Sequence, residues 1–157
     1  MPTLTVKRLQ NVPAEITVPG DKSISHRSAM FAGLADGTTV IDGFLPREDR
    51  LCRLNALEAL GATARPRHPE PGVGLVKMAV TGTAGRLAAP AEPVDCGNSG
   101  TTMRLLSGIL AGQPFTTTLF GDASLSKRPM KRIADPLGQM GARISGQGKK
   151  ICAPITI

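Results

Sequence analysis

Three short segments of this sequence place basic and hydroxyl side chains at the predicted starts of helices. In the first, residues 19–27 (PGDKSISHR), Lys22 and Ser23 fall at a helix start and Arg27 lies about one turn further along. A helix N-terminus has unsatisfied backbone N–H groups and the positive end of the helix dipole, so it attracts anions. The segment is therefore a candidate anion site, although a serine cap with solvated basic neighbours is an equal alternative.

The second segment, residues 95–104 (DCGNSGTTMR), follows the same plan. Glycines let a ligand approach the backbone closely, Thr101 and Thr102 could cap the helix or donate hydrogen bonds, and Arg104 follows four residues after Gly100. The segment contains neither a P-loop nor a dinucleotide-binding pattern. As a glycine-rich turn alone, it is weak evidence for a site.

The third segment, residues 121–132 (GDASLSKRPMKR), places Lys127 and Arg128 directly before Pro129, a residue typical of the first turn of a helix. Positive side chains at that end of a helix oppose its dipole unless an anion lies between them. A planar guanidinium also suits bidentate contact with a carboxylate or a phosphate. A charged helix start is the alternative, but the dipole argument favours a binding site.

The composition narrows the class of ligand. The chain has 157 residues, 41% of them hydrophobic, and its 19 Lys and Arg against 12 Asp and Glu give a net charge of +7. There is no Trp or Tyr, and the four Phe are not interleaved with basic residues as a base-stacking surface requires. Basic residues gathered at helix starts favour a small ligand with several negative charges over nucleic acid. No metal-ligand spacing is present, so no metal site is predicted.

The remaining features indicate an ordinary cytoplasmic domain. The three cysteines, Cys52, Cys96 and Cys152, are widely spaced and predict reduced, mostly buried thiols. No apolar run is long enough for a membrane span, and the first residues lack a secretory signal.

Turn residues divide the chain into alternating helices and strands, which is typical of an α/β protein. Helices are expected over residues 23–35, 47–60 and 101–111 and between Pro129 and Gly141, and strands over 4–6, 16–18, 38–41, 63–68, 76–81, 116–120, 143–145 and 151–157. Residues 83–93 form a connection expected to lie against the surface.

The order of elements occurs twice. Arg27 and Arg104 are 77 positions apart, and Gly43 and Gly121 are 78 apart. A helix, a strand, a turn and a second helix follow one another in the same order and at nearly the same spacing in both copies. The sequence therefore predicts an internal duplication of about 78 residues.

In its three segments the chain resembles the 5-enolpyruvylshikimate-3-phosphate synthases, or 3-phosphoshikimate 1-carboxyvinyltransferases. PGDKSISHR, GNSGTTMR and GDASLSKRPM look like the signatures of that family, in the same order and spacing, and the similarity covers essentially the whole chain. The resemblance implies transfer of the enolpyruvyl group of phosphoenolpyruvate to the 5-hydroxyl of shikimate 3-phosphate, with release of phosphate and without metal or organic cofactor. It also implies the family's inside-out α/β barrel of repeated βαβαββ units.

The resemblance assigns roles to individual residues. Lys22 would contact both substrates as a substrate-positioning catalytic residue, and Ser23 and Arg27 would hold shikimate 3-phosphate. Phosphoenolpyruvate would be held by Lys22 together with Asn98, Gly100, Thr101, Arg104 and Arg128. The inhibitor glyphosate occupies the phosphoenolpyruvate place in this family, and Gly100 resembles the small-residue form that admits it.

A sibling family that acts on UDP-N-acetylglucosamine is the nearest alternative. It typically has Lys-Asn where this chain has Lys22-Ser23, and a reactive cysteine in a loop where residues 121–127 have none. A stand-alone basic anion-binding module without catalysis is an alternative from another class.

Members of the resembled family are much longer than this chain. We divide the chain into a leading strand region belonging to the other domain (1–20), a first βαβαββ unit (21–82), and a connection with a second unit (83–157), two of the three units of one domain. The family's proton-transfer residues would lie beyond Ile157, so we expect a part of a larger enzyme that is inactive alone. Its uncovered helix faces are expected to drive self-association, whereas the full-length enzyme is expected to be a monomer.

Overall fold

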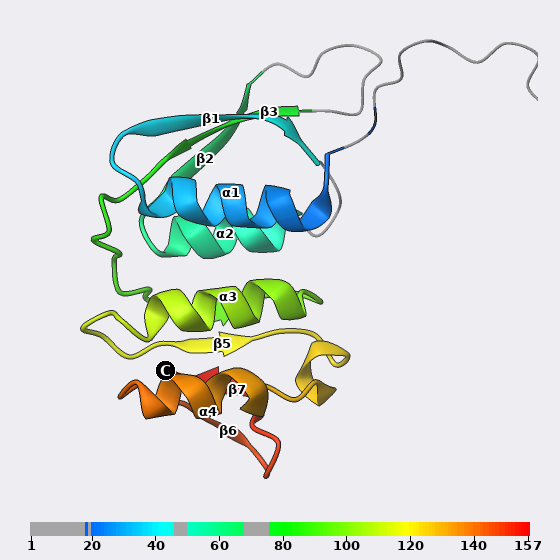
Figure 1. Ribbon diagram of the computed structural model, residues 1–157, viewed down its shortest axis with the longest axis vertical. Helices are drawn as coiled ribbons and strands as arrows, with labels where there is room; N and C mark the ends of the chain where they lie inside the picture. Colours follow the sequence, from blue (N-terminus) through cyan, green and yellow to red (C-terminus); the bar gives the residue numbers. More distant parts are fainter. Residues whose placement is uncertain (1–17, 19, 46–49, 68–75) are drawn as a thin grey trace, which may run out of the picture.

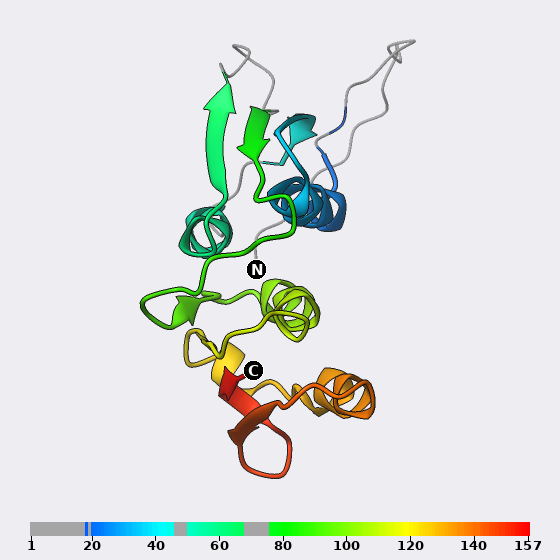
Figure 2. The same cartoon turned by 90° about the vertical axis from the view of Figure 1, so that its left-hand side faces the viewer.

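The computed structural model describes residues 18, 20–45, 50–67 and 76–157 and shows two halves, each with helices packed beside a small sheet (Figure 1). The helices are seen nearly end-on in Figure 2, with the first half above the second in both views. The predicted strand over 4–6 lies outside the described residues, as does that over 16–18 except for Val18, which is not in a strand.

The first half contains two helices and a three-stranded antiparallel sheet in the order β1-β3-β2. Its elements are α1 (Lys22–Leu34), β1 (Thr38–Phe44), α2 (Arg50–Ala59), β2 (Thr63–Arg67) and β3 (Val76–Thr81). Helix α1 begins one residue earlier than predicted because the carboxylate of Asp21 caps it, accepting a hydrogen bond from Ile24 N at 2.7 Å. Ser23 is therefore not the helix cap.

The second half contains a four-stranded sheet in the order β4-β5-β7-β6, in which the short strand β4 runs parallel to β5. Its elements are β4 (Val94–Asp95), α3 (Gly100–Leu110), β5 (Thr118–Phe120), the 3-10 turn η1 (Leu125–Lys127), α4 (Lys131–Gln139), β6 (Ser145–Gln147) and β7 (Cys152–Thr156). Pro129 does not open α4 as predicted. Met130 is the N-cap of α4, and the chain turns through η1 before reaching it.

The two halves repeat one another in strand order and in detail. The order β1-β3-β2 of the first sheet is matched by β5-β7-β6 in the second. In each half, a threonine hydroxyl at the start of one strand meets a threonine hydroxyl at the end of the central strand. The Oγ1 atoms of Thr38 and Thr81 are 2.8 Å apart, and those of Thr118 and Thr156 are 3.1 Å apart. These pairs support the predicted duplication.

A glycine pair in each half allows two backbone segments to come close together. A Cβ atom on Gly20 would overlap the carbonyl oxygen of Gly43, and a Cβ atom on Gly121 would overlap the carbonyl oxygen of Gly97. Gly20 and Gly97 each precede the first helix of their half. Gly43 is the next-to-last residue of β1, and Gly121 directly follows β5. The close approach fixes the position of each helix start relative to the strand that follows it.

The halves share one hydrophobic core. Met30 of α1 and Leu60 at the end of α2 pack in the same buried cluster as Met103 of α3. Leu60 and Met103 have no exposed surface. A smaller cluster that includes Leu57 and Val80 lies within the first half.

The connection between the halves is held against the first half, as predicted. The backbone N–H groups of Thr83, Ala84 and Gly85 donate to carbonyls at the end of α1, and Ala88 N donates to Leu60 O. These bonds satisfy carbonyl groups that a helix end leaves without partners. Of the cysteines, Cys96 is a buried free thiol and Cys152 is a half-buried one.

Candidate functional site

The structure places the three predicted segments along one side of the molecule. Helices α1, α3 and α4 run in the same direction, and their first turns lie at the same side in Figure 1. Figure 2 shows the opposite ends of these helices, stacked in the order α1, α3, α4. The parallel arrangement directs the positive ends of three helix dipoles toward one side of the chain.

At the start of α1, the predicted side chains are exposed. Lys22, Ser23 and Arg27 are all on the surface, and Arg27 folds back so that its Nη1 donates to Ser23 O at 3.2 Å. The neighbouring Ser25 is buried, donating to Asp21 O at 2.8 Å and accepting from Leu45 N at 3.1 Å. Ser25 thus anchors the helix start, a role that the sequence pattern did not indicate.

At the start of α3, Ser99 is the N-cap rather than either threonine. Its Oγ accepts from Thr102 N at 3.2 Å and from Thr102 Oγ1 at 2.8 Å, both buried. Thr102 is therefore occupied in the cap, whereas Thr101 is half-buried. Arg104 lies five residues after its cap and Arg27 lies six after Asp21, so these two arginines do not occupy equivalent helical positions.

The second and third segments are joined by side-chain hydrogen bonds. Arg128 Nη2 donates to Asn98 Oδ1 at 2.6 Å and to Ser124 Oγ at 3.2 Å. Asn98 Nδ2 in turn donates to Asp122 Oδ2 at 2.6 Å. Arg128 is held across the start of α3 by these contacts, while Lys127 stays exposed at the end of η1.

Guanidinium groups converge on Gly100. A Cβ atom on Gly100 would lie 2.8 Å from Arg104 Nη1 and 3.3 Å from Arg128 Nη1. Burial, and then the positive charges of Arg132 and Arg128, lower the pKa of Arg104 from its usual value. Arg104 Nε is buried and has no hydrogen-bond partner among the described residues. An anion bound here would neutralise like charges and accept hydrogen bonds from both arginines.

Asp122 is the acidic member of this site and was not predicted. Hydrogen bonds from Leu125 N and then from Asn98 lower the pKa of its carboxyl group, so it is ionised at neutral pH. Its Oδ1 accepts from Leu125 N at 2.7 Å. An Asp side chain that accepts the backbone N–H three residues further along is typical of a turn or cap, and the Asp-x-x-Leu spacing in GDASL is the signal that could have identified it.

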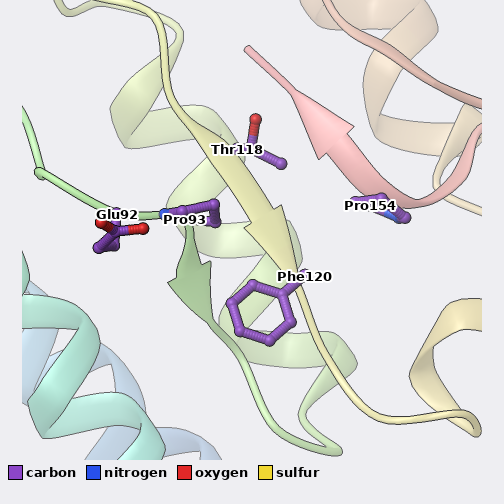
Figure 3. A pocket seen from close by; sticks show the side chains of 5 residues that line it. All are labelled: Glu92, Pro93, Thr118, Phe120 and Pro154. Carbon is purple, nitrogen blue, oxygen red and sulfur yellow. The ribbon is translucent and has the colours of Figure 1, made fainter.

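A hollow that none of the three segments lines is found beside the strands of the second half. Its volume is about 510 Å³, and it is lined by Glu92, Pro93, Thr118, Phe120 and Pro154 (Figure 3). The lining is largely apolar and includes no basic side chain, so it does not suit an anion.

Within the part of the chain that the structure describes, no group of three or more His, Cys, Asp or Glu side chains is placed to share a metal ion. No helix there has the length and apolar character needed to cross a membrane.

Comparison with known proteins gives one consistent result. The sequence profile of EPSP synthase (3-phosphoshikimate 1-carboxyvinyltransferase) matches residues 6–157. The 3-phosphoshikimate 1-carboxyvinyltransferase of Akkermansia muciniphila is 53% identical over 150 residues, which are 95% of this chain and 34% of that protein. The enzyme of the same name from Geotalea uraniireducens is 48% identical over 157 residues, 100% of this chain and 35% of that protein.

Solved structures agree with the sequence comparison. The EPSP synthase from Acinetobacter baumannii superposes with a TM-score of 0.80 and 49% identity, covering 90% of this chain and 31% of that one. The chain spans about a third of the length of the curated relatives it matches. Its two halves have the α/β architecture of the enolpyruvyl transferase fold. The chain belongs to the EPSP synthase family.

Proposed function

We propose that this chain supplies substrate-binding residues of a 3-phosphoshikimate 1-carboxyvinyltransferase. The reaction moves the enolpyruvyl group of phosphoenolpyruvate to the 5-hydroxyl of shikimate 3-phosphate and releases inorganic phosphate. The observation that carries the proposal is the convergence of Arg104 and Arg128 on Gly100. Paired guanidinium groups beside a glycine suit a small ligand that carries both a phosphate and a carboxylate.

The α3 end of the site is proposed to bind phosphoenolpyruvate. Arg128 and Arg104 would contact its negative groups, and Gly100 would allow it to approach the backbone. Asn98 orients Arg128, and Thr101 lies in the first turn of α3 beside Gly100. Glyphosate, an anionic inhibitor of the family, would occupy the same place.

The α1 end of the site is proposed to bind shikimate 3-phosphate. Ser23 and Arg27 would contact it at the first turns of α1, where the helix dipole favours a phosphate. Lys22 would lie between the two substrates and neutralise charge on both. We assign binding, orientation and charge neutralisation to these residues, and no proton-transfer step.

The proposal extends to the organisation of the enzyme and its location. Residues 1–20 would belong to a second domain, 21–82 to one βαβαββ unit, and 83–157 to the connection and another unit; the matched sheet orders support two units. Both substrates are multiply charged and do not cross a lipid bilayer unaided, so the enzyme would act in the cytoplasm with them.

The chain in isolation is proposed to associate with a second copy through α1. Ile24 is 65% exposed and Phe31 is 69% exposed on this helix, an unusual exposure for large apolar side chains. Light scattering should detect the association, and Phe31→Ser should reduce it. A wild-type chain that stays monomeric at high concentration would contradict the proposal.

Titration of the labelled chain, followed by NMR, tests the binding proposal. Shikimate 3-phosphate should shift amide signals of residues 22–27, and phosphoenolpyruvate those of residues 97–104 and 124–128. A dicarboxylate without phosphate is the control and should shift neither set at equal concentration. A folded sample whose signals do not respond to either substrate in the millimolar range would refute the proposed function.

A further inference from the structure

Three hydrogen-bonded side chains connect the loop before α3 to the loop after β5. Asp122 Oδ2 accepts from Asn98 Nδ2 at 2.6 Å, and Asn98 Oδ1 accepts from Arg128 Nη2 at 2.6 Å. Arg128 is the residue whose Nη1 lies beside the Gly100 position. The chain of bonds therefore ends at the point where the arginines converge.

The hydrogen bonds that join these three side chains can run in only one direction, with Arg128 donating to Asn98 and Asn98 donating to Asp122. An ionised carboxylate only accepts hydrogen bonds, and a guanidinium only donates them. Asn98 must then turn its amide nitrogen to Asp122 and its carbonyl oxygen to Arg128, because the opposite orientation would set donor against donor and acceptor against acceptor. Asp122 thus determines which face of Asn98 meets Arg128.

The backbone holds both ends of the series in place. Cys96 N donates to Phe120 O at 2.8 Å and Asp122 N donates to Gly97 O at 3.0 Å, extending the β4–β5 pairing up to the site. The second carboxylate oxygen of Asp122 accepts from Leu125 N at 2.7 Å, which fixes its side chain. Asn98 and Asp122 are therefore adjacent because of the strand pairing rather than by chance orientation of two surface side chains.

We infer that Asp122 is a positioning residue for phosphoenolpyruvate binding, acting through Asn98 to hold the Arg128 guanidinium in its binding orientation. The inference rests on the proposed function for its ligand, and it goes beyond that proposal by giving a role to an acidic residue in an anion site. Asp122 itself does not contact the ligand.

If Asp122 has this positioning role, removing its charge should change the affinity for the anion in the direction opposite to that expected from charge alone. Removing a negative charge from an anion site should strengthen anion binding by simple electrostatics. Asp122→Asn should instead weaken it, because the new amide sets a donor against Asn98 and the reversed Asn98 then sets its own donor against Arg128. Asn at 122 still accepts from Leu125 N, so the local turn is retained.

Asp95→Asn is the matched control. Asp95 is the last residue of β4, the strand before the Asn98 loop, and its Oδ1 accepts from Gly97 N at 2.7 Å, a hydrogen bond that the amide oxygen of Asn can also accept. The control therefore removes the same charge without touching the series. We expect Asp122→Asn to raise the dissociation constant for phosphoenolpyruvate about tenfold, the loss of one charge-assisted hydrogen bond, and Asp95→Asn to leave it equal or lower.

A reversed series provides the rescue. In the double variant Asp122→Asn with Asn98→Asp, the amide at 122 donates to the carboxylate at 98, and that carboxylate accepts from Arg128. The NMR signals of the Arg128 guanidinium report this without ligand, because restricted rotation separates its Nη resonances. They should be separate in wild type, Asp95→Asn and the double variant, and merged in Asp122→Asn.

The two measurements separate the inference from the proposed function. If wild type does not bind phosphoenolpyruvate but the guanidinium signals follow this pattern, the proposed function fails, while the orientation of Arg128 by Asp122 through Asn98 stands. If Asp122→Asn keeps separate Arg128 signals, or if wild type binds phosphoenolpyruvate and Asp122→Asn binds it as tightly as Asp95→Asn does, the positioning role is refuted.

Discussion

The starts of α1 and α3 are related by duplication, yet they hold their basic residues in different ways. At α1, Arg27 is exposed and bonds to Ser23 O of its own helix. At α3, Arg128 reaches from another segment and is held by Asn98 and Ser124. Arg27 is thus held by a contact within its own helix, whereas Arg128 is held by a contact with Asn98, a residue far from it in the sequence.

The residue after the equivalent glycines explains part of this difference. Gly43 is followed by Phe44, which is buried in the core of the first half. Gly121 is followed by Asp122, which organises Asn98 and Arg128. The residue at this backbone position thus packs in a core in one half and takes part in the hydrogen bonds that hold Arg128 in the other. A duplicated fold can diverge in function by one substitution at such a position.

The largest expected effect comes from Leu60, which packs in the core that includes Met30 of α1 and Met103 of α3. Leu60→Ala should lower the free energy of unfolding by about 2–5 kcal/mol, because Leu60 is fully buried in the core that the halves share. Urea unfolding measures the change, and Leu137→Ala, at a half-buried position of α4, is the control. Equal losses in the two variants would contradict the full burial of Leu60 in this core.

Arginine replacements should separate the two helix starts. Arg128→Ala should weaken phosphoenolpyruvate binding about tenfold to a hundredfold, since hydrogen bonds to charged groups are lost, and should leave shikimate 3-phosphate binding nearly unchanged. Arg27→Ala should do the reverse. Calorimetric titration with each substrate measures both effects. A variant that weakens both ligands equally would contradict the assignment of one substrate to each helix start.

A methyl group at Gly100 tests how closely the arginines surround this position. Gly100→Ala should weaken phosphoenolpyruvate binding about tenfold, because its Cβ would lie 2.8 Å from Arg104 Nη1 and displace the guanidinium. Gly108→Ala in the same helix is the control, since its Cβ would meet nothing within 4 Å. The control should stabilise the helix by about 0.4–1 kcal/mol and leave binding unchanged. Identical binding by both variants would exclude convergence at Gly100.

The smallest expected effect is a pH dependence of the free energy of unfolding that comes from Asp122, at the α3 end of the site. The pKa of Asp122 is lowered by folding, so its contribution to stability is present above its ordinary value of 3.8 and is lost as the pH falls through the lower folded value. The stability difference between wild type and Asp122→Asn should therefore be constant near neutral pH and vanish in strong acid. Urea unfolding at a series of pH values measures it, and a difference that grows in acid would have the wrong sign.

Helices and strands followed from local patterns in the sequence. The strand Val76–Thr81 agrees with its predicted bounds, and α3 is displaced by one residue at each end. The predicted start of α4 at Pro129 was wrong, because a proline is compatible both with the first turn of a helix and with the turn that precedes the helix. Capping by Asp21 and Ser99 was missed for a similar reason, since several neighbouring residues could serve as caps.

The candidate binding residues were singled out by residue type, but their grouping was not predicted. Asn98, Gly100, Arg104 and Arg128 each stood out beside a predicted helix start. No feature of the neighbouring sequence indicated that Arg128 bonds to Asn98, thirty positions earlier in the chain. Nor did any indicate that Asp122, in the loop after β5, bonds to Asn98 in the loop before α3. Such contacts depend on strand pairing, and the pairing of β4 with β5 is not encoded in either segment alone.

The sequence by itself determined the family, the duplication and the positive helix starts, because glycines, caps and apolar periodicity act over a few neighbouring residues. The tertiary structure decided which basic residues share a site and which acidic residue orients them. The parallel pairing of β4 with β5 brings Asn98 beside Asp122, and the return of the chain through η1 brings Arg128 to Asn98. Hydrogen-bond direction is a property of side chains in contact, so it exists only once the chain has folded.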